Sequence, residues 1–224
     1  MEGIIMSILH SEPLASLLDS LFREADAELP ADSPAALLSD AEHGRLMQSK
    51  TEYLDFYGRL KDLPLAVSRE TGVLLYMLAR NGGARTIIEY GTSFGISTLY
   101  LAAALRENGG GRLITSEFEP SKVKKARENL ATGGLGDLVE IRQGDAMETL
   151  SADIPKAVDL LLLDGAKALY PEILGLIEKR FRPGALVVAD DAEYCPDYLS
   201  LVRSSGRYLS VSVTDDVELS LFLG

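Results

Sequence analysis

Apolar and polar positions along the chain follow two periods, and together they predict strands that alternate with helices. The clearest example is an apolar run at 87–90, interrupted by Gly91 and Gly95, which resumes at 98–105. The first part has the pattern of a buried parallel strand and the second that of a helix packed on it. The glycines therefore lie in a strand-to-helix turn, where free N–H groups of the helix can face a nucleotide-like ligand.

The same alternation continues to the C-terminus. Strands are expected at 112–116, 138–142, 158–163 and 185–189, and helices at 120–130, 146–150, 171–181 and 197–203. This order predicts an α/β fold with a doubly wound, mostly parallel, Rossmann-like sheet. Two last strands, 208–213 and 217–222, are separated only by turn residues, so they should form an antiparallel hairpin at the sheet edge and complete seven strands.

The N-terminal part reads as helical. A helix should begin at 11–13, with an apolar stripe of Leu14, Leu17, Leu18, Leu21 and Phe22. Prolines 30 and 34 bracket a loop, 35–60 looks like one helix, and 68–81 forms another that stops at Gly82 and Gly83. We expect residues 1–62 to form a helical extension, which either packs on the core or serves as a lid or dimer contact, and residues 63–224 to form the main domain.

Composition narrows the kinds of partner. The formal net charge of −12 opposes sequence-independent binding to nucleic acid or to an anionic membrane, because both depend on Lys and Arg meeting phosphate. A single cysteine, Cys195, excludes an internal disulfide and suits a reducing compartment. The opening residues lack a basic region and are too short to span a bilayer. We expect a cytoplasmic protein with a small-molecule partner.

The glycine turn differs from a dinucleotide fingerprint. Gly91 and Gly95 are separated by three residues and no third glycine follows, while Glu89 places a carboxylate at the mouth of the turn, where it would repel phosphate and suit a cation. Glu117, 26 residues after Gly91, can accept hydrogen bonds from ribose hydroxyls, or can simply be a favourable charge at the start of the next helix. An NAD-dependent oxidoreductase remains an alternative at this point.

Carboxylates also follow the later strands. Asp164 ends one strand and the pair Asp190 and Asp191 ends the next. Parallel strands lie about 4.8 Å apart, so the three side chains can converge, and an all-oxygen set suits Mg²⁺, or else Mn²⁺ or Ca²⁺. The alternative is that one or two of them are solvated turn residues. Lys167 follows the same strand as Asp164, and beside a cation it would lose its proton more easily and serve as a general base.

Five motifs in register resemble the cation-dependent O-methyltransferases that use S-adenosylmethionine. They are Glu89–Ser97, Ser116–Phe118, Gly144–Ala146, Leu163–Lys167 and Ala189–Asp191. The resemblance covers the chain from about residue 65 to the end, and residues 190–199 look closest to the catechol O-methyltransferase branch. It implies a class I methyltransferase fold, with residues 63–224 as the methyltransferase domain.

The resemblance also implies roles for individual residues. The methionine end of the cofactor would meet Gly91, Ser93 and Ser97, with Glu89 beneath it and Val67 closing over it; Gly95 and Phe118 belong to the same cofactor motifs. Glu117 would hold the ribose, and Asp145 with Ala146 would flank the adenine. Asp164, Asp190 and Asp191 would bind the metal, Asp164 also bordering the cofactor. Lys167 would take the proton of the hydroxyl being methylated, on a catechol-like or vicinal-diol phenolic acceptor.

Some positions depart from the family pattern. Asp191 replaces the usual Asn, Ala166 replaces an acidic residue, and Tyr194 stands where tryptophan is expected. No carboxylate occurs at 208–213, where the catechol enzyme grips its second hydroxyl. A catalytically silent S-adenosylmethionine-binding protein remains an alternative, and a homodimer is expected by analogy. A serine hydrolase is disfavoured, because His10 and His43 both lie in the N-terminal extension and no nucleophile elbow is present.

Overall fold

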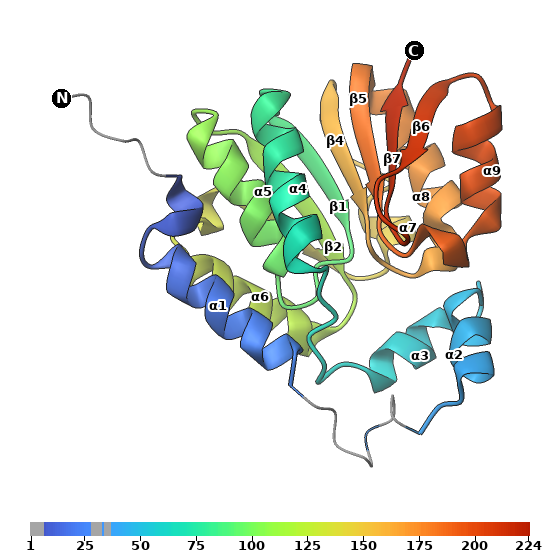
Figure 1. Ribbon diagram of the computed structural model, residues 1–224, viewed down its shortest axis with the longest axis horizontal. Helices are drawn as coiled ribbons and strands as arrows, with labels where there is room; N and C mark the ends of the chain where they lie inside the picture. The colour runs from blue at the N-terminus through green and yellow to red at the C-terminus, as the bar shows by residue number, and fades with distance from the viewer. Residues whose placement is uncertain (1–6, 28–32, 34–36) are drawn as a thin grey trace.

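The computed structural model describes residues 7–27, 33 and 37–224, and its centre is one seven-stranded sheet (Figure 1). The strands run in the order β3-β2-β1-β4-β5-β7-β6. Strands β1 to β5 are parallel to one another, whereas β7 is antiparallel to β5 and to β6. The predicted fold class, with its C-terminal antiparallel hairpin, is confirmed. Strand bounds are β1 Thr86–Tyr90, β2 Arg112–Glu117, β3 Val139–Gln143, β4 Val158–Leu163, β5 Phe181–Ala189, β6 Tyr208–Ser212 and β7 Glu218–Phe222.

Helices cover both faces of the sheet. Ile87 and Leu162 point to the face that packs with α1, α4, α5 and α6, while Ile88 and Leu161 point to the face that packs with α7, α8 and α9. This division follows from the alternation of side chains along each strand. Helix bounds are α1 Leu14–Ala25, α4 Arg69–Asn81, α5 Ile96–Glu107, α6 Pro120–Thr132, α7 Ala146–Thr149, α8 Tyr170–Ile177 and α9 Pro196–Ser204. Among the described residues, no helix has the length and apolarity that crossing a bilayer requires.

The register of the central strands brings their carboxyl ends to one level. Tyr90 pairs with Leu163, and Leu163 pairs with Ala189. The next residues continue the ladder, because Asp164 donates its N–H to Tyr90 O at 2.8 Å and Asp190 donates its N–H to Leu163 O at 2.9 Å. The glycine turn, Asp164 and Asp190 therefore begin at neighbouring points of one sheet edge.

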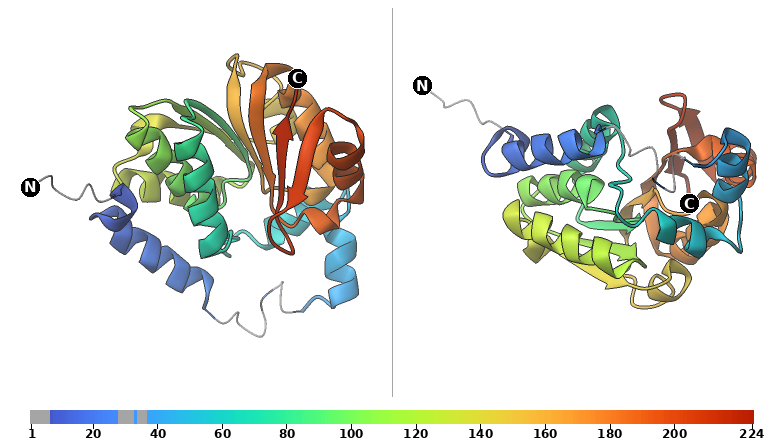
Figure 2. Two further views of the ribbon diagram at one scale, coloured as in Figure 1. Left: turned by 45° about the horizontal axis from the view of Figure 1, so that its top comes forward. Right: turned by 90° about the horizontal axis from the view of Figure 1, so that it is seen from below.

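The N-terminal segment divides into two parts. Helix α1 belongs to the main core, as its apolar stripe predicts, with Leu14 and Phe22 buried against the sheet's helical layer. Helices α2 (Asp40–Met47) and α3 (Tyr53–Arg59) instead share a small apolar cluster of their own, centred on Leu46 and Phe56. They lie beside the carboxyl ends of the strands (Figures 1 and 2). We call α2 and α3 together the α2–α3 unit.

Three sequence predictions of element bounds are wrong. The single helix expected over 35–60 is two helices, because Ser39 caps the start of α2 and Ser49 accepts the N–H of Glu52 just ahead of α3. The helix expected over 171–181 ends at Ile177, and β5 begins at Phe181 rather than at 185. Pro183 and Gly184 are uncommon inside a strand, so the sequence pattern placed its start after them. The pairing of this part of β5 with β4 is irregular. Residues 30 and 34–36 lie outside the described part of the chain.

Candidate cofactor and acceptor site

The glycine turn is built by close contact between two strand ends. Gly91 has a φ of +98°, and a Cβ at this position would collide with the carbonyl group of Asp164. Gly95 has a φ of +86° and begins α5, where an added Cβ would touch Ala126 of α6 at 3.4 Å. Gly91 therefore allows the turn to pass β4, whereas Gly95 provides the left-handed backbone that starts α5.

Glu89 is fully buried beneath this turn. Its carboxylate accepts hydrogen bonds from Ser97 Oγ at 2.7 Å and from Thr98 Oγ1 at 2.6 Å. Burial raises the pKa of Glu89 to about 7, although these hydroxyl donors oppose the shift. A positively charged ligand above the turn would favour the ionised form of this group.

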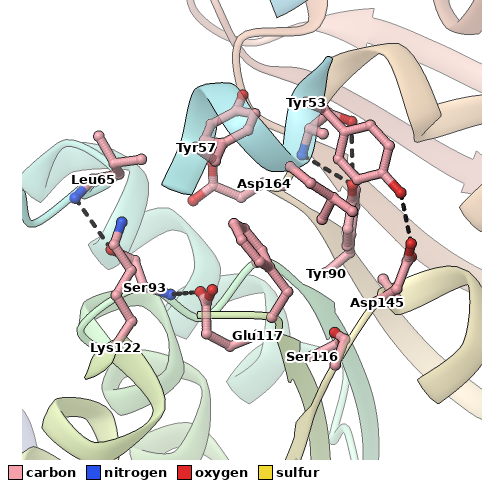
Figure 3. Close-up of a pocket in the computed structure, with 17 residues that line it drawn as sticks. Tyr53, Tyr57, Leu65, Tyr90, Ser93, Ser116, Glu117, Lys122, Asp145 and Asp164 are labelled. Carbon is pink, nitrogen blue, oxygen red and sulfur yellow. Dashed lines mark hydrogen bonds between the residues drawn. The ribbon is translucent and has the colours of Figure 1, made fainter. Parts of the chain in front are cut away.

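A pocket of about 620 Å³, counting the part open to solvent, lies above the turn, and we call it the glycine-turn pocket. Glu117 borders it, with its carboxylate fixed by the N–H groups of Ser93 at 2.9 Å and Glu119 at 3.0 Å. Burial raises the pKa of Glu117. Figure 3 shows Glu117 and Asp145 at different places along the same cavity. The expected cofactor residues that line it are Gly91, Ser93, Glu117, Phe118, Asp145, Ala146 and Asp164.

The remaining expected cofactor residues do not line this pocket. Glu89 and Ser97 are buried behind the glycine turn, where they bond to each other. Gly95 faces α6, and Val67 lines a separate cleft that it shares with Asp190, Asp191 and other residues.

Sequence reasoning missed several residues of the glycine-turn pocket. Tyr53 and Tyr57 reach it from α3, one helical turn apart, and Leu65 follows them along the chain. Their spacing of four residues on a helix was the available signal, because it places both rings on one face. Lys122 of α6 also lines the pocket with only 3% of its surface exposed, and burial lowers the pKa of its ammonium group.

A further pocket also has Leu65 in its wall, and we call it the acidic pocket. One wall carries the expected residues Asp164, Lys167, Asp190 and Asp191. The opposite wall comes mostly from the α2–α3 unit and the segment after it, through His43, Met47, Phe56, Tyr57, Leu60, Pro64, Leu65 and Ala66. A charged wall thus faces a largely apolar, partly aromatic wall.

Lys167 lies between two of the aspartates. Its Nζ is 2.9 Å from Asp164 Oδ1 and 3.2 Å from Asp191 Oδ2, and the side chain is only 4% exposed. Burial opposes its charge, but the neighbouring carboxylates outweigh that effect and raise the pKa of Lys167 well above its ordinary value. The sequence predicts a more easily lost proton only beside a bound cation, whereas in the present ion pair the carboxylates keep Lys167 charged.

The donor set suits a hard cation, but its present arrangement is that of an ion pair. Three carboxylates face one ammonium group, and burial together with the charge of Asp164 raises the pKa of Asp190 to about 8. Asp191 adopts a left-handed backbone with a φ of +50°. Across the described residues, no group of three His, Cys, Asp or Glu side chains is placed to hold a metal ion. The oxygen donors and surplus negative charge fit a divalent cation, provided that Lys167 moves from between Asp164 and Asp191.

The two pockets meet at one place. Tyr57, Leu65 and Asp164 line both of them. In Figure 3 the labelled Tyr57 and Asp164 lie near each other, above the labelled Glu117. A molecule in the glycine-turn pocket and another in the acidic pocket would therefore meet beside Asp164.

The fold agrees with that of known methyltransferases. A family model described as a methyltransferase domain matches residues 88–192. An O-methyltransferase from Streptomyces achromogenes, solved in complex with S-adenosylmethionine, superimposes with a TM-score of 0.62 and 29% identity, over 85% of this chain and 93% of that one.

Curated relatives narrow the family. The catechol O-methyltransferase of Niastella koreensis is 36% identical over 57% of this chain and 58% of its own length, so the match spans little more than half of that relative. Catechol O-methyltransferase B of Danio rerio is 30% identical over 99% of this chain and 88% of its own length. The chain belongs to the O-methyltransferase family that includes the catechol O-methyltransferases.

Proposed function

We propose that this protein transfers the methyl group of S-adenosylmethionine to a hydroxyl of a small catechol-like or vicinal-diol phenol. The observation that carries the proposal is the junction of the glycine-turn pocket with the acidic pocket at Tyr57, Leu65 and Asp164. A methyl donor and its acceptor must meet with their reacting atoms in contact, and two pockets that share a wall provide such a meeting point.

The cofactor would occupy the glycine-turn pocket. Glu117, already held by two backbone N–H groups, would accept hydrogen bonds from the ribose hydroxyls. Asp145 and Ala146 would flank the adenine. The methionine end would lie toward Gly91 and Ser93, with Glu89 beneath and Val67 nearby, and the sulfonium charge would be drawn toward Asp164.

The acceptor would occupy the acidic pocket. Its aromatic ring would pack against the apolar wall that Met47, Phe56 and Tyr57 provide, and its hydroxyls would face the aspartates. Lys167 Nζ, once separated from Asp164 and Asp191 and having lost its own proton to solvent beside the cation, would accept the proton of the hydroxyl being methylated. The enclosing residues would exclude water from the transfer.

A divalent cation, Mg²⁺ in the first place, would be held by Asp164, Asp190 and Asp191. When bound, such an ion lowers the pKa of a phenolic hydroxyl and orients two neighbouring oxygens. The extra carboxylate of Asp191 would strengthen ion binding, because it adds a negative charge where the family usually has an amide.

Methyl transfer from S-adenosylmethionine to catechol, measured with Mg²⁺ and with a chelator, tests the proposal. We expect turnover that the chelator abolishes. Asp164→Ala should reduce turnover by at least about 100-fold, because it removes a group shared by the two pockets. Asp137→Ala serves as the control and should keep normal turnover, because Asp137 is an exposed carboxylate that lines neither pocket.

Three results would contradict parts of the proposal. Turnover that persists unchanged in the presence of the chelator would show that the reaction does not need a divalent cation. Unchanged turnover in Asp164→Ala would place the reaction elsewhere. Binding of S-adenosylhomocysteine without transfer to any catechol or vicinal diol would favour the silent binding protein.

A further inference from the structure

Tyr53 connects the α2–α3 unit to the far end of the glycine-turn pocket. It is the first residue of α3, and its hydroxyl donates a hydrogen bond to Asp145 Oδ2 at 2.6 Å (Figure 3). Both residues line the pocket. This contact links segments 92 residues apart in the sequence, across the position that we assign to the adenine.

The carboxylate of Asp145 is fixed at both oxygens. Oδ1 accepts the N–H of Met147 at 2.8 Å at the start of α7, and Oδ2 accepts the Tyr53 hydroxyl. A carboxylate oxygen can accept two hydrogen bonds, so each oxygen retains acceptor capacity for a ligand. An acceptor of this kind matches a donor such as the 6-amino group of adenine and repels a carbonyl oxygen at the same place.

The Tyr53 hydroxyl remains a donor at any physiological pH. Burial and the hydrogen bond to Asp145 raise the pKa of Tyr53 to about 12. The start of α3 is itself anchored, because Ser49 Oγ accepts the N–H of Glu52, and Glu52 forms an ion pair with Arg45 of α2 at 2.5 Å. The ring therefore approaches Asp145 from a fixed helix start rather than from a free loop.

We propose that Tyr53 is a positioning residue for cofactor selection: it orients Asp145 so that the carboxylate accepts the amino group of adenine. The inference rests on the proposed function, since it requires the adenosyl group in the glycine-turn pocket. Without the tyrosine hydroxyl, the carboxylate of Asp145 can rotate and accept hydrogen bonds from water instead. The preference for an amino over a carbonyl group at position 6 of the purine then decreases.

The test compares two ligands that differ at that position. S-adenosylhomocysteine carries the 6-amino group, and S-inosylhomocysteine carries a 6-carbonyl. Titration calorimetry should show that the wild-type protein binds the adenosyl compound at least about 10-fold more tightly. In Tyr53→Phe this ratio should fall to within about threefold, because the ring stays but the donor is lost.

Asp145→Asn provides the second variant. The amide offers both an acceptor and a donor, so it should also remove most of the discrimination. If Tyr53 acts through Asp145, the double variant should discriminate no less than Asp145→Asn alone. A further loss of discrimination in the double variant would contradict action through Asp145.

Tyr76→Phe is a matched control. The Tyr76 hydroxyl also donates to a carboxylate, that of Glu107, but it lies on α4 outside the glycine-turn pocket. Thermal unfolding of Tyr53→Phe and Tyr76→Phe would measure the stability that each variant loses. The wild-type ligand preference should persist in Tyr76→Phe.

The possible failures are distinguishable. If the wild-type protein does not bind S-adenosylhomocysteine, the proposed function fails. If the wild-type protein discriminates between the two ligands and Tyr53→Phe keeps the same ratio, the role of Tyr53 is wrong and the proposed function stands. Tighter binding of S-adenosylhomocysteine by Tyr53→Phe would mean that Tyr53 competes with adenine for Asp145, and it would also overturn the inference.

Discussion

Buried charges explain much of the chemistry at this sheet edge. Glu89, Glu117, Lys122 and Lys167 are all nearly inaccessible to solvent. Burying a charge is unfavourable unless a partner or ligand compensates. Lys167 has its compensation within the protein, in Asp164 and Asp191, whereas Glu89 has only neutral hydroxyl donors. Glu89 is therefore the residue at which a positively charged ligand would change the energetics most.

Glu89 should make stability depend on pH. Its folded pKa of about 7 lies above the ordinary value of 4.5, so the folded state binds more protons between these pH values. Stability from this group is complete below pH 4.5 and is lost as pH rises through 7, a change of about 3 kcal/mol. Glu89→Gln should remove that loss. Its free energy of unfolding, measured with denaturant, should therefore rise relative to that of the wild-type protein between pH 5 and pH 8.

Glu128→Gln is the control for this experiment, because Glu128 is an exposed carboxylate on α6. Its free energy of unfolding should depend on pH as that of the wild-type protein does. An equal pH dependence in Glu89→Gln and wild type would show that Glu89 ionises normally in the folded protein.

Helices α2 and α3 differ from the rest of the fold in how they are held. Their small apolar cluster also includes Met47 and Leu60, separate from the two larger clusters that flank the sheet. Polar contacts join them to the main body, among them Tyr53 with Asp145 and Lys50 with Glu172, and the rings of Tyr53 and Tyr57 also pack against one of the larger clusters. Of the roles left open for the N-terminal extension, packing on the core describes α1, and we propose the lid role for α2 and α3 only.

Amide hydrogen exchange should distinguish α1 from the α2–α3 unit in the N-terminal segment. We expect amides of α3 to exchange faster than those of α5 by roughly two orders of magnitude, because α3 is short and exposes Leu54, Asp55 and Arg59, whereas α5 is buried from Ile96 to Leu105. S-adenosylhomocysteine should slow exchange in α3, since Tyr53 and Tyr57 border its proposed pocket.

Helix α1 is the internal control for the exchange experiment, because it also precedes residue 62 but packs in the core. Its exchange should be slow and unaffected by the ligand. Equal protection of α1 and α3, with or without ligand, would contradict a lid formed by α2 and α3.

The parallel sheet was predictable because each strand is a short apolar run bounded by turn residues. The places of Asp164 and Asp190 followed from that prediction, since the carboxyl ends of parallel strands lie at one edge. The contribution of α3 was only partly predictable: the four-residue spacing of Tyr53 and Tyr57 places both rings on one helix face, but it does not say which surface that face contacts, and Tyr53 meets Asp145, 92 positions away. The ion pairing of Lys167 also depends on side-chain positions that spacing does not determine.

The whole molecule places two pockets at one sheet edge, with a shared wall at Asp164. Its acidic character agrees with a cationic methyl donor and opposes a phosphate-rich cofactor, since the formal net charge is −12 and Glu89 lies below the glycine turn. The alternative of an NAD-dependent oxidoreductase requires a pyrophosphate at the same turn. The identity of the cofactor is thus the question on which the proposed function depends.

Calorimetric titration with S-adenosylhomocysteine and with NAD, each with and without Mg²⁺, answers that question most directly. We expect saturable binding of S-adenosylhomocysteine at one site per chain and no measurable binding of NAD. Binding of NAD without S-adenosylhomocysteine would contradict the cofactor assignment of the glycine-turn pocket and, with it, the proposed methyl transfer.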